Sequence, residues 1–265
     1  MKQIKRAFIP QEDIAPSSKP KDAFLRFFSG RHQKRDSFGR YTELQRSVFS
    51  HTLATADGRL IYVKNPKAGC STVAHLLYEY ENGHMYEGDI HYAPILKVIE
   101  KWPHLRDIPE KTISFSTVRN PERRCVSGFF DFFIKQQNPE APKHLKDIEV
   151  FGFSLKADNH YRFDVYLDYV EAYFEYSMLR TDRHFRPQHI NLGHREIELS
   201  YISRVETLDA DLQHVAERAG VTFRTSDGIS KRIKNQSGSS QFVPSTSQRR
   251  KIEILYYKDY ELYGY

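Results

Sequence analysis

A short segment near residue 70 combines a positive charge with several groups that can donate hydrogen bonds to an anion. Lys67, Gly69, Ser71 and Thr72 lie between an apolar run, residues 60–63, and a stretch with helical periodicity. At a strand–helix junction, free backbone N–H groups and the positive end of the helix dipole attract phosphate. Glycine also lets the backbone approach an anion without a Cβ in the way. We therefore expect a phosphate-binding loop here; an ordinary strand–helix turn is the alternative.

Arg119 occupies a comparable position further along the chain. It follows a second β-rich run, residues 112–118, and precedes Asn120-Pro121, a typical helix start with an N-cap residue and a proline at the first helical position. Ser127 comes eight residues after Arg119, about two helical turns, and so on roughly the same side of the helix. A guanidinium at the carboxyl end of a parallel strand suits phosphate. The alternatives are a structural salt bridge for Arg119 and a helix-surface role for Ser127.

The elements that would position these residues alternate between strand and helix. Residues 60–63 and 112–118 read as buried strands. Val73, Leu76, Leu77 and Tyr80 recur at i, i+3, i+4 and i+7, which predicts a helix over 71–82 that ends before Gly83. This alternation predicts a three-layer α/β fold with a central parallel sheet flanked by helices.

The rest of the chain divides into an arm and the remainder of one domain. Residues 1–45 are predicted to be a partly extended N-terminal arm, and residues 46–265 a single domain. After the first two strands we expect a helix over 121–136, a mobile loop over 137–160, a helix over 161–176, a strand over 199–202, a helix over 207–219 and a last helix from 244.

Composition narrows the class of protein. The 265 residues include 40 Lys+Arg and 34 Asp+Glu, a formal net charge of +6, and 14% are aromatic. The aromatic content argues against wholesale disorder, and no apolar run is long enough to span a membrane. Two cysteines, Cys70 and Cys125, cannot form a disulfide framework. The charge suggests an anionic partner, although surplus Lys and Arg also simply solubilise a protein.

Five segments, in order, resemble the PAPS-dependent sulfotransferases of the Golgi carbohydrate type, which include the heparan and chondroitin sulfotransferases; PAPS is 3′-phosphoadenosine-5′-phosphosulfate. The family's first loop typically reads Pro-Lys-x-(Gly/Ala)-(Cys/Ser)-(Thr/Ser), and its second Val-Arg-(Asn/Asp)-Pro-(x)2-Arg-(x)2-Ser. The matching segments of this chain are Pro66-Lys67-Ala68-Gly69-Cys70-Ser71-Thr72, Val118-Arg119-Asn120-Pro121-Glu122-Arg123-Arg124-Cys125-Val126-Ser127, His184-Phe185-Arg186-Pro187-Gln188, Ser203-Arg204-Val205-Glu206-Thr207-Leu208 and Tyr257-Lys258-Asp259-Tyr260-Glu261-Leu262-Tyr263-Gly264-Tyr265.

The resemblance implies a P-loop-like sulfotransferase fold, PAPS as sulfuryl donor, and a hydroxyl-bearing acceptor, expected to be a carbohydrate. The residues it assigns to the 5′-phosphosulfate are Lys67, Ala68, Gly69, Cys70, Ser71 and Thr72, and those it assigns to the 3′-phosphate are Arg119 and Ser127. Lys67 would stabilise charge on the departing phosphate. No metal is expected, since the lysine and the helix dipoles supply positive charge.

His91 is the expected general base. It lies between the two phosphate-binding segments, where the resembling enzymes commonly have an acceptor-side histidine, and an imidazole has an unperturbed pKa near 6.5. A surface or capping histidine is the alternative reading. His184 is the second candidate, more suited to shaping the pocket.

The chain departs from the Golgi enzymes in its ends and cysteines. It shows neither their N-terminal membrane anchor nor their luminal disulfides. The Golgi location therefore does not carry over, and a soluble, cytoplasmic, bacterial enzyme is expected, with no stable membrane insertion and no nucleic-acid partner.

Two other functions stay open at this stage. A nucleotide or small-molecule kinase on the same fold would need ATP and magnesium. Against it, a Walker A motif has its lysine directly before Ser/Thr, whereas Lys67 lies four residues before Ser71, and no Walker B acid is evident. A non-enzymatic polyanion-binding module would show a concentrated basic stripe, but here basic and acidic residues are interspersed.

Overall fold

The computed structural model describes residues 41–102, 107–223 and 241–265. Most of the predicted arm, residues 1–40, and the basic, Gly/Ser-rich stretch 231–240 lie outside the described residues, and the division at residue 45 stays a prediction. The elements, in order, are α4 (Glu43–Phe49), β1 (Thr52–Ala54), β2 (Leu60–Val63), α5 (Cys70–Asn82), η2 (Ile90–Tyr92), α6 (Val98–Lys101), β3 (Ile113–Val118), α7 (Pro121–Phe129), η4 (Phe130–Ile134), α8 (Ala141–Ile148), η5 (Glu149–Phe151), α9 (Asn159–Ser177), α10 (Gln188–Asn191), β4 (Tyr201–Arg204), η6 (Val205–Thr207), α11 (Leu208–Ala219), α12 (Thr246–Leu255) and α13 (Tyr257–Tyr263).

The described strands form one sheet in the order β1-β2-β3-β4. β2, β3 and β4 are parallel, as the alternation of strands and helices predicts. β1 runs antiparallel to β2, so the prediction of a wholly parallel sheet is wrong and the sheet is mixed. The reason is the connection: a tight turn at Gly58, with φ +76, joins β1 to β2, and so short a link allows only antiparallel pairing.

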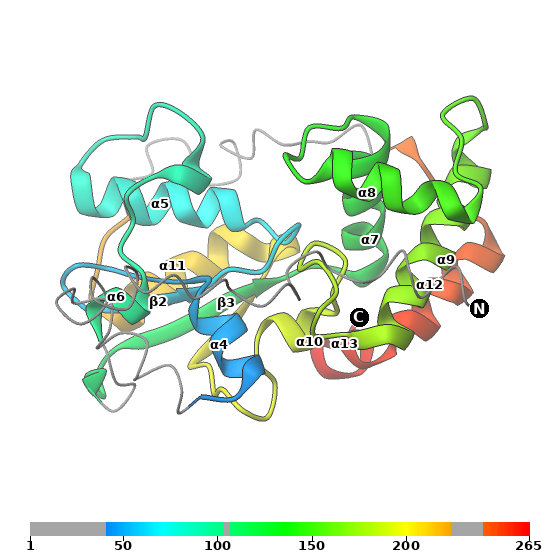
Figure 1. Cartoon of the computed structure of the whole chain (residues 1–265). Coiled ribbons are helices and arrows are strands. Elements are labelled where there is room, and N and C mark those ends of the chain that lie inside the picture. The colour runs from blue at the N-terminus through cyan, green and yellow to red at the C-terminus, as the bar shows by residue number, and fades with distance from the viewer. Residues whose placement is uncertain (1–40, 103–106, 224–240) are drawn as a thin grey trace, which may run out of the picture.

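Helices cover both faces of the sheet, which gives the expected three layers (Figure 1). Leu60, Tyr62 and Phe115 point to one face, where they pack in a cluster with α5 and α11. Ile61 and Val63 alternate with them and point to the other face, toward α4 and α6. This alternation along β2 explains why its four residues are all apolar and all buried.

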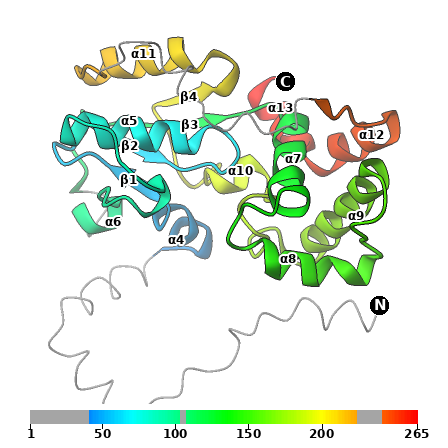
Figure 2. The ribbon, with the colours of Figure 1, turned by 90° about the horizontal axis from the view of Figure 1, so that it is seen from above.

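A second core lies beside the sheet, where α7, α8, α9 and α12 gather (Figure 2). Its buried members are mostly aromatic and include Phe129, Phe132, Phe133, Phe163 and Tyr166. This cluster accounts for much of the high aromatic content. No helix within the described residues is long and apolar enough to cross a membrane.

Two predicted elements differ from the structure in this second core. The helix predicted over 121–136 is α-helical only to Phe129 and continues as one π-helical segment, η4. The prediction of a mobile loop over 137–160 is wrong, because α8 and η5 lie there. Pro142 sits in the first turn of α8, where proline starts a helix instead of breaking one. The helices at α9 and α11 are confirmed within two residues, and β4 begins two residues later than predicted.

Candidate active site

The loop between β2 and α5 has the backbone conformation of an anion-binding loop. Lys67 and Gly69 both have left-handed backbones, with φ values of 63° and 77°. Gly69 is the N-cap of α5 and contributes no capping side chain. The N–H groups of Cys70, Ser71 and Thr72 in the first turn therefore have no side-chain cap, and N–H groups at this end of a helix can bind an anion. Within the predicted set, Ala68, Cys70 and Thr72 are buried, whereas Lys67, Gly69 and Ser71 are partly exposed.

The second predicted segment lies against this loop. Asn120 caps α7 by accepting a hydrogen bond from the backbone N–H of Arg123 at 3.1 Å, as the Asn-Pro pair predicts. The guanidinium of Arg119 donates to the backbone carbonyl of Lys67 at 3.3 Å. Burial lowers the pKa of Arg119, and the nearby carboxylate of Glu206 opposes that shift. The structure thus brings the two predicted phosphate-binding segments together at the carboxyl edge of β2 and β3.

Gln188 holds the two segments in this arrangement. It is fully buried, and its side-chain oxygen accepts hydrogen bonds from the backbone N–H of Arg119 and the side-chain amide of Asn65, both at 3.0 Å. Its side-chain nitrogen donates to the Arg119 carbonyl at 2.8 Å. Asp259 of α13 in turn accepts from the backbone N–H of Gln188 at 2.7 Å. In the sequence, Gln188 stands out only as part of a matching segment, and this linking role is not visible there.

Arg124 makes a second set of links beneath the site. Its side chain is buried and donates to three backbone carbonyls, those of Pro66 at 3.0 Å, Arg186 at 2.9 Å and Arg183 at 2.9 Å. The first of these belongs to the β2–α5 loop, and the others to the segment before α10. One guanidinium therefore ties three parts of the chain together, which its position inside a helix does not reveal.

Lys67 forms an ion pair with Asp131, a residue that lies in none of the matching segments. Its Nζ lies 3.0 Å from Oδ2 of Asp131 in η4, and about one fifth of each side chain is exposed. Ser127 belongs to α7, one helical turn before Asp131, and is buried. A lysine at this position can turn its ammonium either to the carboxylate or to an anion in the loop, because it has three donors.

His91, the predicted base, belongs to η2, and its side chain contacts the first turn of α5. Its Nε2 is 3.0 Å from Oγ of Ser71, and its Nδ1 is 3.3 Å from Nζ of Lys64. An ammonium only donates, so Nδ1 is the acceptor and Nε2 carries the proton toward Ser71. Partial shielding of the ring from water lowers the pKa of His91, the charge of Lys64 lowers it further, and Asp89 opposes them. The lowered pKa favours the neutral imidazole, the form that a general base needs.

The second histidine candidate belongs to a separate network. Nδ1 of His184 lies 2.7 Å from one oxygen of Asp182, and Nε2 of the buried His144 lies 3.1 Å from the other. His144 continues to the hydroxyl of Tyr169 at 2.7 Å. Burial alone would raise the pKa of Asp182, but the hydrogen bonds from both imidazoles hold it well below the usual value. A positive charge on His184 would lower the pKa of His91.

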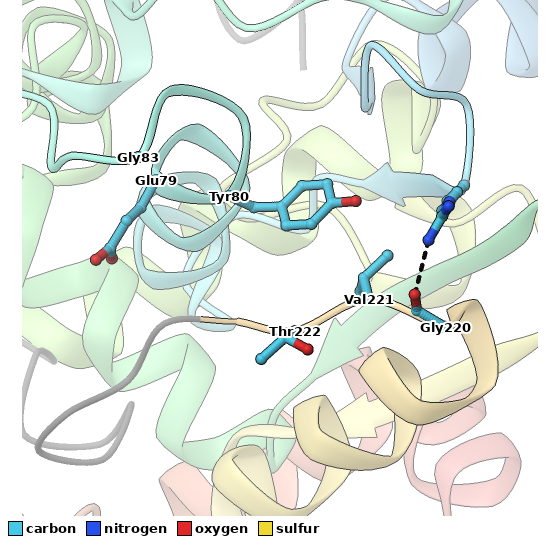
Figure 3. Close-up of a pocket in the computed structure, with 7 residues that line it drawn as sticks. Glu79, Tyr80, Gly83, Gly220, Val221 and Thr222 are labelled. Atoms are coloured by element: carbon cyan, nitrogen blue, oxygen red, sulfur yellow. Dashed lines mark hydrogen bonds between the residues drawn. The ribbon is translucent and has the colours of Figure 1, made fainter.

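A hollow in the described structure lies away from this site. It has a volume of about 350 Å³ and is bordered by the ends of α5 and α11, with Tyr80 and Val221 on its walls (Figure 3). Arg59 also lines it and donates to the carbonyl of Gly220 at 2.7 Å. Arg59 precedes β2 and Lys67 follows it, so this hollow lies at the amino end of β2 and the candidate site lies at its carboxyl end. Within the described residues, no group of three or more His, Cys, Asp or Glu could hold a metal ion.

Comparison with known proteins identifies the family of the chain. The sequence model of the sulfotransferase family matches residues 50–265, a range that includes both predicted phosphate-binding segments, His91 and α13. No curated protein and no solved structure matches the chain. The family match spans most of the sequence and every element of the described sheet. The chain belongs to the sulfotransferase family, whose members are enzymes that transfer a sulfuryl group.

Proposed function

We propose that this enzyme takes the sulfuryl group from PAPS and transfers it to a hydroxyl of a carbohydrate. The observation that carries the proposal is the contact between the guanidinium of Arg119 and the backbone carbonyl of Lys67, which joins the two segments that carry these cations at the carboxyl ends of β2 and β3. PAPS carries a phosphate at the 3′ position and a phosphosulfate at the 5′ position, and each cation suits one of these groups. We also assign the chain to the P-loop-like folds, on the basis of the parallel strands β2–β4 and the loop before α5.

The roles of the binding residues follow from their positions. The first-turn N–H groups of α5, with the Ser71 hydroxyl, would hold the 5′ end, since this helix start has no side-chain cap. Arg119 and Ser127 would hold the 3′-phosphate. When bound, PAPS supplies the sulfuryl group together with a phosphate leaving group. Lys67 would balance the negative charge that this phosphate gains as it departs.

His91 is proposed as the group that takes the proton of the acceptor hydroxyl. It is exposed, so an acceptor can reach it from solvent. In the free enzyme the Lys64 ammonium faces Nδ1, the nitrogen with the lone pair. The acceptor hydroxyl would donate its proton to the unprotonated ring nitrogen of His91 while its oxygen attacks the sulfur, and the bond from the sulfur to the departing phosphate would break.

An aromatic side chain beside His91 supports a carbohydrate acceptor. Tyr92 is 74% exposed, although large aromatic rings are normally at least half buried. Its ring offers a flat apolar surface with a polar tip, which matches the mixed character of a sugar ring. A panel of desulfated polysaccharides, simple alcohols and phenols, assayed with labelled PAPS, tests the acceptor class.

The donor is tested by thermal stabilisation of the full chain. Because a ligand that binds only the folded state raises the melting temperature, 3′,5′-ADP, the desulfated product, should stabilise the protein, whereas 5′-AMP should do so much less. A response only to ATP with magnesium would overturn the proposal in favour of a kinase. Equal stabilisation by any polyanion, including heparin, would favour a polyanion-binding module.

A further inference from the structure

The carboxylate of Asp131 has no part in the proposed reaction, although it forms an ion pair with Lys67. Asp131 Oδ2 is 3.0 Å from Lys67 Nζ, with side-chain exposures of 19% and 18%. An ion pair this well shielded is screened by salt less than a surface pair. In the free enzyme, Lys67 is therefore already bound to an anion, which belongs to the protein itself.

The helix that carries Asp131 is built to keep the carboxylate in this position. At the end of α7 the hydrogen-bond pattern widens, and the N–H of Lys135 donates to the carbonyl of Phe130 at 2.8 Å across a π-helical turn. Such turns are rare and frequently lie at functional sites. Phe130, Phe132 and Phe133 on the same turn are buried in the aromatic core, and Asp131 among them faces Lys67. The core thus anchors the residues on either side of Asp131.

A nucleotide phosphate in the β2–α5 loop would meet this carboxylate at the same ammonium. Two anions beside one lysine repel each other, and each competes for the lysine's three N–H donors. We propose that Asp131 is an exchange partner for Lys67. It holds the lysine in the empty site, yields it to the 5′ end of the bound nucleotide, and takes it back as the product leaves. Asp131 is then a positioning residue that weakens nucleotide binding and speeds product release; this inference rests on the proposed function.

The test is calorimetric titration of the full-length protein with 3′,5′-ADP. Asp131→Asn should bind this nucleotide roughly tenfold more tightly than the wild type, since 1.4 kcal/mol of lost competition corresponds to a factor of ten. A purely structural role predicts the opposite sign, because damage to the site weakens binding. Asp131→Glu, which keeps the charge, should stay near the wild-type affinity. Asp131→Ala serves as a second neutral variant should the Asn protein not fold.

Two further proteins separate exchange from simple charge effects. Asp168→Asn removes the same charge from an ion pair with Lys251 on the helices α9 and α12, and should leave the affinity unchanged. In a Lys67→Ala background, Asp131→Asn should no longer tighten binding, because nothing remains to exchange. Tightening that persists there means direct repulsion and overturns the inference, as does unchanged or weaker binding by Asp131→Asn alone. A wild type that does not bind 3′,5′-ADP at all overturns the proposed function itself.

Discussion

His91 and Ser71 are 20 residues apart in the sequence, and their side chains lie 3.0 Å apart across the start of α5. The contact joins the proposed base to the first turn of the helix that would hold the sulfuryl donor. Nε2 of His91 faces this turn and Nδ1 faces Lys64, so the contact with Ser71 fixes the imidazole beside the donor loop. An acceptor that reaches the exposed part of His91 from solvent therefore comes close to the proposed donor site.

His91→Ala should abolish most turnover without affecting nucleotide binding. Loss of a general base typically lowers kcat by roughly 10²- to 10⁴-fold, whereas the N–H groups of α5 that would hold the phosphates remain. The measurements are kcat with labelled PAPS and the Kd of 3′,5′-ADP. His84→Ala, at the exposed far end of α5, is the matched control and should behave as wild type. Near-normal kcat in His91→Ala would remove His91 from the mechanism.

The pH dependence of kcat/KM should report on the charge of Lys64, because kcat/KM follows the ionisation of the free enzyme. Partial shielding from water and the charge of Lys64 both lower the pKa of His91 below its ordinary value of 6.5. A neutral base loses activity as pH falls through its pKa, so the acid limb of the kcat/KM profile should lie below pH 6.5. Lys64→Met removes one positive charge, raises the pKa of His91 and should move this limb to higher pH.

The control for this shift is Lys101→Met. Lys101 lies over the ring of Trp102, 5.1 Å from its centroid, on α6 at the far side of the sheet from His91. Its removal changes the net charge equally and should not move the acid limb. If both variants move it by the same amount, the effect is one of overall charge and Lys64 has no special role.

Most of the fold could be predicted from local pattern. The strands β2 and β3, the helix α5 and the cap at Asn120 depend on residues close in sequence, and all are confirmed. β1 could not be assigned as an antiparallel partner, because only three residues form it and its pairing is decided by the tight turn at Gly58. The helix α8 could not be predicted, because Pro139 and Pro142 look like loop residues, whereas Pro139 lies just before the helix and Pro142 lies in its first turn.

The candidate site could be predicted only in part, for a similar reason. Lys67 and Arg119 follow strands that must be neighbours in a parallel sheet, so their approach is foreseeable. Asp131 and Gln188 reach the site through a π-helical turn and a buried amide, and both depend on contacts between distant segments. Nothing in the local sequence distinguishes Asp131 from any other acidic residue on a helix.

Arg124 should be essential for the architecture of the site. Arg124→Met leaves three buried backbone carbonyls without their donor, and each hydrogen bond to a charged group is worth about 1.5–3 kcal/mol. We expect a loss of at least about 3 kcal/mol in the free energy of unfolding, together with loss of 3′,5′-ADP binding, since Pro66 would be released. Urea denaturation and calorimetry check both. Arg123→Met, one residue earlier and exposed, should be nearly neutral; equal effects at both positions would contradict the role of Arg124.

Asp182 should stabilise the fold in a pH-dependent way. Its folded-state pKa lies well below the ordinary value of 3.8, because hydrogen bonds from His144 and His184 outweigh burial. A carboxylate with a depressed pKa contributes stability above its unfolded pKa and loses it as pH falls through the folded value. Asp182→Asn should therefore cost roughly 2–3 kcal/mol at pH 7, and the difference from wild type should shrink as pH falls below about 4. Urea denaturation across this range measures it. Asp168→Asn, at an exposed ion pair, should cost under about 1 kcal/mol, and a wild-type advantage that stayed constant down to the lowest pH would show that the ionised carboxylate is not its source.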